Sequence, residues 1–180
     1  MSSSTCFLSW LTLSIVLITS KLTMAADSAT EAKIDTLCHQ IEEFGFCSQT
    51  FHQNLKGGSA DYVGLTQIAT NQAYSNATNT LGYIEQLLRS TTDPALKNDL
   101  IVCENAFKIV KQAFGEALKL FSQRDYRGML SAERPTPRAQ ASCDVIFSTP
   151  PARHSPIMDE RNREMRILIA MAITSGSNIH

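Results

Sequence analysis

The amino-acid sequence predicts an all-α protein, a disulfide-stapled up-down-up-down four-helix bundle with an N-terminal helical hairpin extension. Apolar residues recur three or four positions apart along most of the chain after residue 61, which is the spacing of one helix face. Four of the five cysteines follow a segment typical of secretion signals, which indicates disulfides. Strand-like alternation and the Asn-Gly or Asp-Gly turns of β-hairpins are absent. We therefore expect residues 26–180 to form one domain of packed helices.

The first predicted element is a cleaved signal peptide at residues 1–25. The chain begins with twenty uncharged residues, and the apolar stretch from Phe7 to Ile18 has the length of a secretory signal's hydrophobic region. Small residues at Thr23 and Ala25 predict cleavage after Ala25. An uncleaved membrane anchor is the alternative, although the apolar run is short for a membrane span. Cleavage would leave a secreted, extracellular chain with no membrane segment.

Removal of the signal would leave four cysteines, which are Cys38, Cys47, Cys103 and Cys143. An even number in a secreted chain predicts two disulfides, with three pairings to choose from. Loop length favours Cys38 with Cys47, nine positions apart, and Cys103 with Cys143. Loop entropy would then stabilise the fold by about 2.7 kcal/mol and about 4 kcal/mol. A zinc site at Cys47 and His52 is the alternative, but the cysteine spacing does not fit structural zinc and we expect no metal.

Residues 26–60 are the predicted hairpin extension. The segment is too short and too polar to be a separate domain, and the small disulfide would close it. Phe44-Gly45-Phe46, between its two cysteines, is a place where the chain can reverse. The segment ends in Lys56-Gly57-Gly58-Ser59, which we expect to be a flexible linker to the bundle at residues 61–180.

Two long amphipathic helices open the predicted bundle. The first covers residues 62–88, whose apolar positions form one stripe. Asp93 before Pro94 provides an N-cap with proline at the first helical position, and a second stripe follows as far as Phe121. The first stripe contains Leu65, Ile68, Ala69, Ala73, Ala77, Thr80, Ile84, Leu87 and Leu88, and the second contains Leu96, Leu100, Cys103, Phe107, Val110, Phe114, Ala117, Leu118 and Phe121.

A third and a fourth helix are predicted from their capping residues. Asp125 can cap a helix that runs toward Cys143, and Ser155-Pro156 can open the last helix. The third helix is interrupted by the sequence Arg134-Pro135-Thr136-Pro137-Arg138, because a proline inside a helix removes a hydrogen bond and clashes with the preceding turn. We expect a break near Arg134, helix again by Ala139, and a higher melting temperature when both prolines are replaced by alanine.

No catalytic motif accompanies this helical pattern. The chain lacks the Gly-x-Ser-x-Gly, Gly-x-Gly-x-x-Gly, Walker and His-Glu-x-x-His motifs, and its four histidines are scattered. Its 16 basic and 17 acidic residues give a formal charge of −1, which does not attract nucleic acid. We expect no enzymatic activity, no cofactor and no nucleic-acid partner.

Asn76-Ala77-Thr78 is the N-glycosylation sequon of the chain. Asn76 is next to Ala77, a residue of the first apolar stripe, so it should lie at the edge of the buried face. We predict Asn76 as a glycosylation site, and the position inside a helix is the argument against it.

Several of these features together resemble a known family. They are the signal peptide, the four-cysteine frame, Asp93-Pro94-Ala95-Leu96-Lys97 ahead of the third cysteine, Asp125-Tyr126 and Ser155-Pro156. The combination resembles the plant invertase inhibitor and pectin methylesterase inhibitor family over residues 34–175, most closely the invertase-inhibitor branch with its pollen-allergen relatives. The resemblance implies a disulfide-bonded four-helix bundle with a helical hairpin, in which the first cysteine pairs with the second and the third with the fourth.

The resemblance also implies a function and a site. Family members plug the active site of a secreted plant carbohydrate enzyme, here most directly acid invertase (β-fructofuranosidase), with pectin methylesterase as the alternative target. In invertase inhibitors a Pro-Lys-Phe element between the second and third bundle helices enters the acidic active site. In this chain Tyr126 matches the aromatic residue, Asp125 stands in the place of the lysine, and only Arg124 and Arg127 could supply the positive charge. We predict that these four residues contact the partner enzyme.

Other interpretations of the turn and of the whole chain remain open. Asp125 could be only a helix cap, with Tyr126 packed on the core and the two arginines solvated. The chain could also be a non-inhibitory secreted bundle, either allergen-like or carrying an apolar ligand. The family resemblance implies the cell wall as the location, with the vacuole as a second choice, and a monomer or weak dimer.

Overall fold

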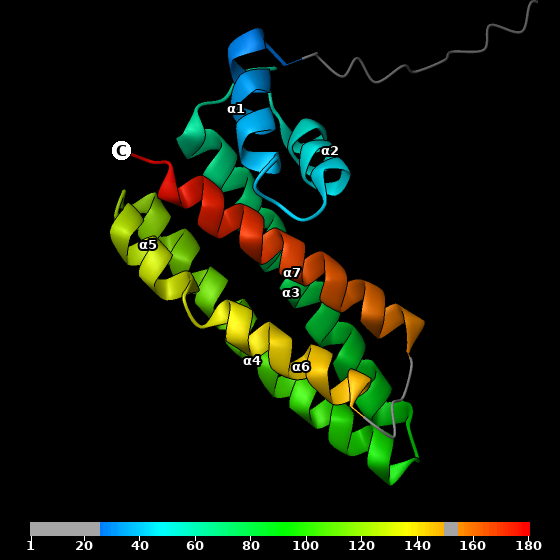
Figure 1. Cartoon of the computed structure of the whole chain (residues 1–180). Helices are drawn as coiled ribbons and strands as arrows, with labels where there is room; N and C mark the ends of the chain where they lie inside the picture. The colour runs from blue at the N-terminus through cyan, green and yellow to red at the C-terminus, as the bar shows by residue number, and fades with distance from the viewer. Residues whose placement is uncertain (1–25, 150–154) are drawn as a thin grey trace, which may run out of the picture.

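The computed structural model describes residues 26–149 and 155–180, so the signal peptide predicted for residues 1–25 lies outside the described residues. The described part is all-helical, and α1 and α2 form a hairpin at one end of an antiparallel bundle (Figure 1). The predicted fold class is therefore confirmed. The helices are α1 (Ser28–Cys38), α2 (Phe44–Asn54), α3 (Tyr62–Ser90), α4 (Pro94–Ser122), α5 (Tyr126–Glu133), α6 (Thr136–Ser148) and α7 (Pro156–Ser177).

The bundle is built from α3, α4, α7 and the pair α5 and α6, which follow one another along α4 (Figure 1). The α3 stripe buries Ala69, Ala73 and Ala77 completely, and these small side chains let neighbouring helices approach closely. From α4, Phe107 and Phe114 fill the space between the helices. Among the described residues, no helix combines the length and hydropathy that a membrane span requires.

Aspartates begin the two longest helices, and the Asp93 cap is the one that the sequence predicts. The Asp93 side chain accepts a hydrogen bond from the Ala95 backbone N–H at 2.9 Å, and Pro94 occupies the first turn of α4. Asp61 caps α3 in the same way, accepting from the Gly64 N–H at 2.8 Å. These bonds satisfy backbone donors that have no partner within the helix.

Two disulfides join Cys38 to Cys47 and Cys103 to Cys143, which confirms the pairing that loop length favours. The first closes the hairpin of α1 and α2, and the second joins α4 to α6 inside the bundle. All four cysteines are completely buried. The disulfide at Cys47 removes the thiolate that the alternative zinc site would need, so that alternative is wrong.

The hairpin is held to α7 by ion pairs that the sequence analysis did not anticipate. In the loop between α1 and α2, Glu42 accepts from Arg166 Nε at 2.8 Å and Glu43 pairs with Arg163. Arg163 also binds Glu160 and lies over the Phe46 ring, with 5.6 Å from its guanidinium carbon to the ring centroid. The two acidic partners hold the pKa of Arg163 above its usual value. Half-exposed pairs of this kind fix the position of the hairpin more than they add stability.

The linker after α2 is fastened to α1, although its glycines had predicted flexibility. Thr30 Oγ1 donates to the Ala60 carbonyl at 3.1 Å and accepts from the Ala60 N–H at 2.9 Å. The Asp27 N–H donates to the Gly58 carbonyl at 2.8 Å. Gly57 and Gly58 have φ of 83° and 75°, the left-handed region that glycine adopts without strain. Gly57 and Gly58 are therefore part of a turn that hydrogen bonds hold in place.

The third bundle helix breaks where the prolines predict. α5 ends at Glu133 and α6 begins at Thr136, in agreement with a break near Arg134 and helix again by Ala139. Pro137 lies in the first turn of α6, where its missing N–H removes no helical hydrogen bond. The Thr136 hydroxyl donates to the Glu133 carbonyl at 2.7 Å, which satisfies an acceptor that the break would otherwise leave open.

Candidate functional site

The turn between α4 and α5 contains the predicted partner-binding residues. Its backbone forms a Schellman motif, in which the Arg124 N–H donates to the Phe121 carbonyl at 2.9 Å and the Asp125 N–H to the Leu120 carbonyl at 3.0 Å. The next helix begins directly afterwards at Tyr126. The turn is consequently short and hydrogen-bonded at both ends.

Arg124 occupies the left-handed position of this motif, with a φ of 60°. Glycine is usual there, because a Cβ atom in the left-handed region costs about 1–2 kcal/mol. The Arg124 and Arg127 side chains are exposed, and neither makes a hydrogen bond or ion pair with the described residues. Two cations are thus presented to solvent by a backbone that is fixed.

Asp125 faces back toward α5. Its Oδ1 accepts from the Gly128 N–H at 2.8 Å and caps the helix. A Cβ added at Gly128 would lie 2.2 Å from Asp125 Oδ2, so the close approach of the cap depends on glycine. The Asp125 carboxylate is therefore engaged in capping.

Tyr126 packs edge-on against Phe121 of α4, with ring centroids 5.6 Å apart, and remains half-buried. A surface hollow of about 520 Å³ adjoins the pair and reaches across to the first half of α3. The turn is hence bordered by a concave surface. This hollow is lined by Val63, Gln67, Asn71, Leu118, Phe121, Ser122, Arg124 and Tyr126.

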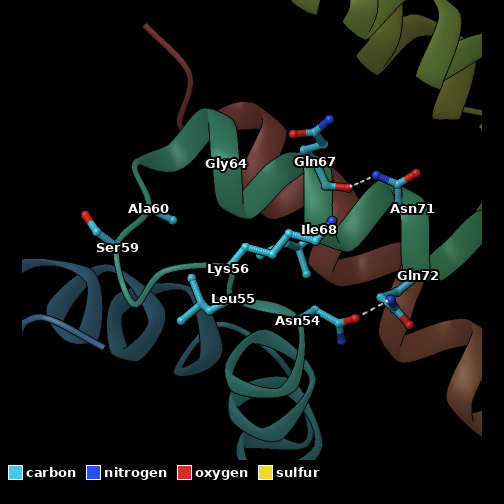
Figure 2. Close-up of a pocket in the computed structure, with 10 residues that line it drawn as sticks. All are labelled: Asn54, Leu55, Lys56, Ser59, Ala60, Gly64, Gln67, Ile68, Asn71 and Gln72. Atoms are coloured by element: carbon cyan, nitrogen blue, oxygen red, sulfur yellow. Dashed lines mark hydrogen bonds between the residues drawn. The ribbon is translucent and has the colours of Figure 1, made fainter. Parts of the chain in front are cut away.

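A second hollow, of about 500 Å³, lies between the hairpin and α3 (Figure 2). Its lining is mostly uncharged, with amide side chains such as Asn54 and Gln72, which hydrogen-bond to each other at 2.8 Å. Lys56 extends from the linker toward α3 in Figure 2. Gln67 and Asn71 line both hollows, so the turn and the hairpin linker belong to one end of the bundle. The amide lining is poorly suited to the apolar ligand of the carrier alternative.

Glu133 is the titratable residue that the sequence analysis missed. It is completely buried at the C-terminal end of α5, and burial raises the pKa of its carboxyl to about 7. Thr70 of α3 donates a hydrogen bond to Oε1 at 3.3 Å, whereas Oε2 has no hydrogen-bond partner. The spacing could have revealed it, because Glu133 is four residues after the buried Met129 and therefore on the same face of α5.

Most of the chain matches a known protein family. Residues 32–174 match the family described as "Plant invertase/pectin methylesterase inhibitor". The chain belongs to this family of plant inhibitors. The resemblance inferred from the cysteine frame and the Asp-Pro-Ala-Leu-Lys segment is confirmed. Because the family consists of enzyme inhibitors, the chain is an inhibitor-family protein and not an enzyme.

Curated relatives of the chain include proteins named as invertase inhibitors and proteins named as pectinesterase inhibitors. A "Putative invertase inhibitor" from Platanus orientalis is 27% identical over 132 residues, which cover 73% of this chain and 78% of that protein. A "Pectinesterase inhibitor" from Actinidia deliciosa is 25% identical over 118 residues, which cover 66% of this chain and 64% of that protein. The two names leave the target of this inhibitor-family chain undecided.

The fold also matches a solved structure. A mutant form of a pectin methylesterase inhibitor from Arabidopsis superposes with a TM-score of 0.74 and 16% identity, over 82% of this chain and 97% of that one. At this identity the match shows that the two proteins share the fold.

The predicted glycosylation site lies within the inhibitor fold on α3. Asn76 Nδ2 donates to Glu164 Oε2 of α7 at 3.0 Å, and Asn76 Oδ1 accepts from Thr80 Oγ1 at 3.4 Å. A glycan would be attached to that same nitrogen. Glycosylation of Asn76 stays a prediction, and it would replace a contact between α3 and α7.

Proposed function

We propose that the protein inhibits a secreted plant carbohydrate enzyme, acid invertase first, by placing the α4–α5 turn in its active-site cleft. The observation that supports this most directly is the turn itself, where Arg124 and Arg127 are exposed, without an ion-pair partner in the described part of the chain, beside the aromatic pair Tyr126 and Phe121. Secretion to the cell wall, as a monomer or weak dimer, is part of the proposal.

The charge of the turn suits such a cleft. Glycoside hydrolases carry a pair of catalytic carboxylates, and a guanidinium can bind a carboxylate through two parallel hydrogen bonds. Arg124 and Arg127 are available for this because neither has an ion-pair partner among the described residues. Asp125 does not compete, since its Oδ1 is bonded to the Gly128 N–H.

The rigidity of the turn supports the same function. The Schellman bonds at Phe121 and Leu120 and the cap at Asp125 fix the backbone before any partner is bound. A loop that is already in its bound conformation loses less entropy on association. A left-handed Arg124 costs stability, and such strain in an exposed turn is often associated with a binding role.

The experiment is a titration of purified acid invertase and, in parallel, of pectin methylesterase with the oxidised mature chain from Ala26. We expect saturable loss of invertase activity. Arg124→Ala and Arg127→Ala should each weaken inhibition about tenfold or more, as expected for an arginine in the centre of an interface. Arg89→Ala is the matched control, because Arg89 is an exposed arginine in the last turn of α3 at the opposite end of the bundle. Equal inhibition by all three variants would contradict the role of the turn.

Pectin methylesterase is the second candidate target. Asp125 occupies the place of the lysine in the invertase-inhibitor pattern, and the Actinidia relative is named for pectinesterase inhibition. Saturable loss of pectin methylesterase activity with invertase unaffected would assign the chain to that branch. If neither enzyme lost activity while circular dichroism showed a folded bundle, the inhibitor proposal would be wrong and the non-inhibitory interpretation would stand.

A further inference from the structure

The two ends of α5 perform different tasks in the structure. Its first residue, Tyr126, belongs to the proposed binding turn, and its last residue, Glu133, is buried against the bundle. A helix of eight residues has few internal hydrogen bonds, so its position depends on what anchors its ends. Whatever holds Glu133 therefore also positions the turn.

The anchor at Glu133 is a close and incomplete polar contact. The carboxyl reaches Thr70 of α3 at 3.3 Å, but its second oxygen has no partner. One turn earlier in α5, a Cβ at Gly176 of α7 would come within 2.7 Å of Met129 and 2.9 Å of Leu130. α5 thus lies tightly on α7 at this point.

The chain beyond Glu133 is a joint. α5 ends there, the next helix starts at Thr136, and Pro135 lies between them. The Thr136 hydroxyl donates to the Glu133 backbone carbonyl at 2.7 Å and is the observed link across this break. Because no continuous helical ladder crosses the joint, α5 can move without unwinding α6.

No charged group compensates the Glu133 carboxyl in the described structure. Only burial and the Thr70 hydroxyl influence its pKa, the first raising it and the second lowering it. Residues 62–84 of α3 and 167–177 of α7 contain no charged side chain. The ionisable groups of the surrounding elements face elsewhere. On α3 and α4, Tyr74 and Lys111 line an outer hollow, and Glu116 pairs with Lys119. Asp144 of α6 pairs with Arg166 of α7, and the side chains of Arg127, Arg134 and Arg138 are exposed.

We infer that Glu133 is a positioning residue for the proposed binding turn: its neutral carboxyl holds α5 in place, and its ionisation loosens α5. A neutral carboxyl can be buried with one hydrogen bond at modest cost, whereas a carboxylate needs several donors. The link to target binding rests on the proposed function. The anchoring itself can be tested on the protein alone.

The primary experiment is amide hydrogen exchange of α5 and of the Arg124 and Asp125 amides, each rate divided by its intrinsic rate at the same pH. An opening that exposes Glu133 returns its pKa from about 7 to the ordinary 4.5. Linkage then predicts that protection of α5 falls about tenfold between pH 6 and 8 and about 70-fold between pH 5 and 8. Amides in the middle of α4 exchange through global unfolding, which also exposes Glu133, so a local opening of α5 is identified by the lower protection of α5 at each pH.

Three variants separate anchoring from a general structural effect. In Glu133→Gln, an uncharged residue of the same shape, protection of α5 should not change with pH. Glu116→Gln makes the same change on an exposed glutamate and should keep the wild-type profile. Thr70→Val removes the hydrogen bond that favours the carboxylate, so the fall should continue to higher pH. A fall that persists in Glu133→Gln, or no fall in the wild type, would overturn the inference.

A second measurement tests the connection to the target. The inhibition constants of the wild type and Glu133→Gln are compared at each pH, so that the pH dependence of the enzyme cancels. We expect them to agree at pH 5.5 and the wild type to become several-fold weaker by pH 8. A constant ratio together with pH-dependent exchange would overturn the positioning role in binding. If neither enzyme were inhibited, the proposed function would fail, and the exchange result would still decide the anchoring.

Discussion

The two ends of α5 place charged groups in opposite environments, exposed at the start of the helix and buried at its end. At the start of the helix, backbone donors of the turn are paired and the charged side chains of Arg124 and Arg127 extend into water. At its end, the Glu133 carboxyl is buried and bonded only to Thr70, next to a proline joint. The first end has a strained backbone with solvated charges, and the second has an ordinary backbone with a poorly solvated carboxyl.

This contrast indicates where the chain can change without losing its fold. A charge in an exposed turn is solvated by water, so arginine, lysine or aspartate can be exchanged there at small cost in stability. A buried carboxyl has no such freedom, because each change alters burial and hydrogen bonding together. The exposed turn at the start of α5 can thus change to suit a target, while the buried Glu133 end of the helix holds the turn in position.

The largest expected effect is the pH dependence that Glu133 contributes to folding. Its pKa is raised in the folded state, so the stability it contributes is complete below about pH 4.5 and is lost as pH rises through about 7. The free energy of unfolding of the wild type, relative to Glu133→Gln, should fall by about 2.5 kcal/mol between pH 5 and 8. Urea unfolding of both proteins at the two pH values measures this. A constant difference would show that water or an alternative rotamer compensates the carboxylate.

The next effect tests the cap at the other end of the helix. Asp125→Ala should lower the free energy of unfolding by about 1 kcal/mol, equally at pH 6 and 8, because it removes the bond to the Gly128 N–H.

The same cap can be tested through Gly128. Glycine-to-alanine substitutions in a helix normally stabilise by about 1 kcal/mol, but an alanine Cβ at position 128 would collide with Asp125. We expect Gly128→Ala to stabilise the protein only when Asp125 is already alanine. Thermal unfolding of the two single variants and the double variant forms the cycle, and additive effects would contradict the observed close approach.

A smaller effect separates stability from binding at Arg124. Arg124→Gly relieves the left-handed strain and should raise the free energy of unfolding by less than about 1 kcal/mol, because glycine also gains freedom in the unfolded chain. Inhibition should weaken in the same variant. Arg127→Gly is the matched control, since Arg127 lies within α5 and glycine there should destabilise. A loss of stability in both variants would argue against the Schellman turn.

Much of the fold follows from local sequence signals. The stripes of α3 and α4, the Asp93 and Asp125 caps and the two disulfide loops are all encoded within short segments, so spacing and capping rules identify them. The Glu42 and Glu43 contacts with Arg166 and Arg163 join residues more than a hundred positions apart, and no spacing rule reports such pairs. The Glu133 contact with Thr70 was missed for the same reason.

In the predicted site, too, local features could be read from the sequence and features that depend on three-dimensional packing could not. That Asp125 could cap α5 was evident from the sequence, whereas the left-handed Arg124 was not, because that position usually holds glycine. The linker was predicted to be flexible from its glycines, but the bonds of Thr30 to Ala60 depend on where α1 lies in three dimensions. Composition describes the freedom of an isolated segment, and packing decides whether that freedom is kept.

The smallest expected effect concerns Pro135 and Pro137, and here the structure changes the expectation drawn from the sequence. A proline in a helix interior costs about 3 kcal/mol, but neither proline lies in one, since Pro135 precedes α6 and Pro137 lies in its first turn. The Thr136 hydroxyl already bonds to the Glu133 carbonyl. We therefore expect the double alanine variant to change the free energy of unfolding by less than about 1 kcal/mol, because little is left to repair and proline also restricts the unfolded chain. A large rise in melting temperature would mean that the joint strains the third helix, and α5 would then be held by that strain as well as by Glu133.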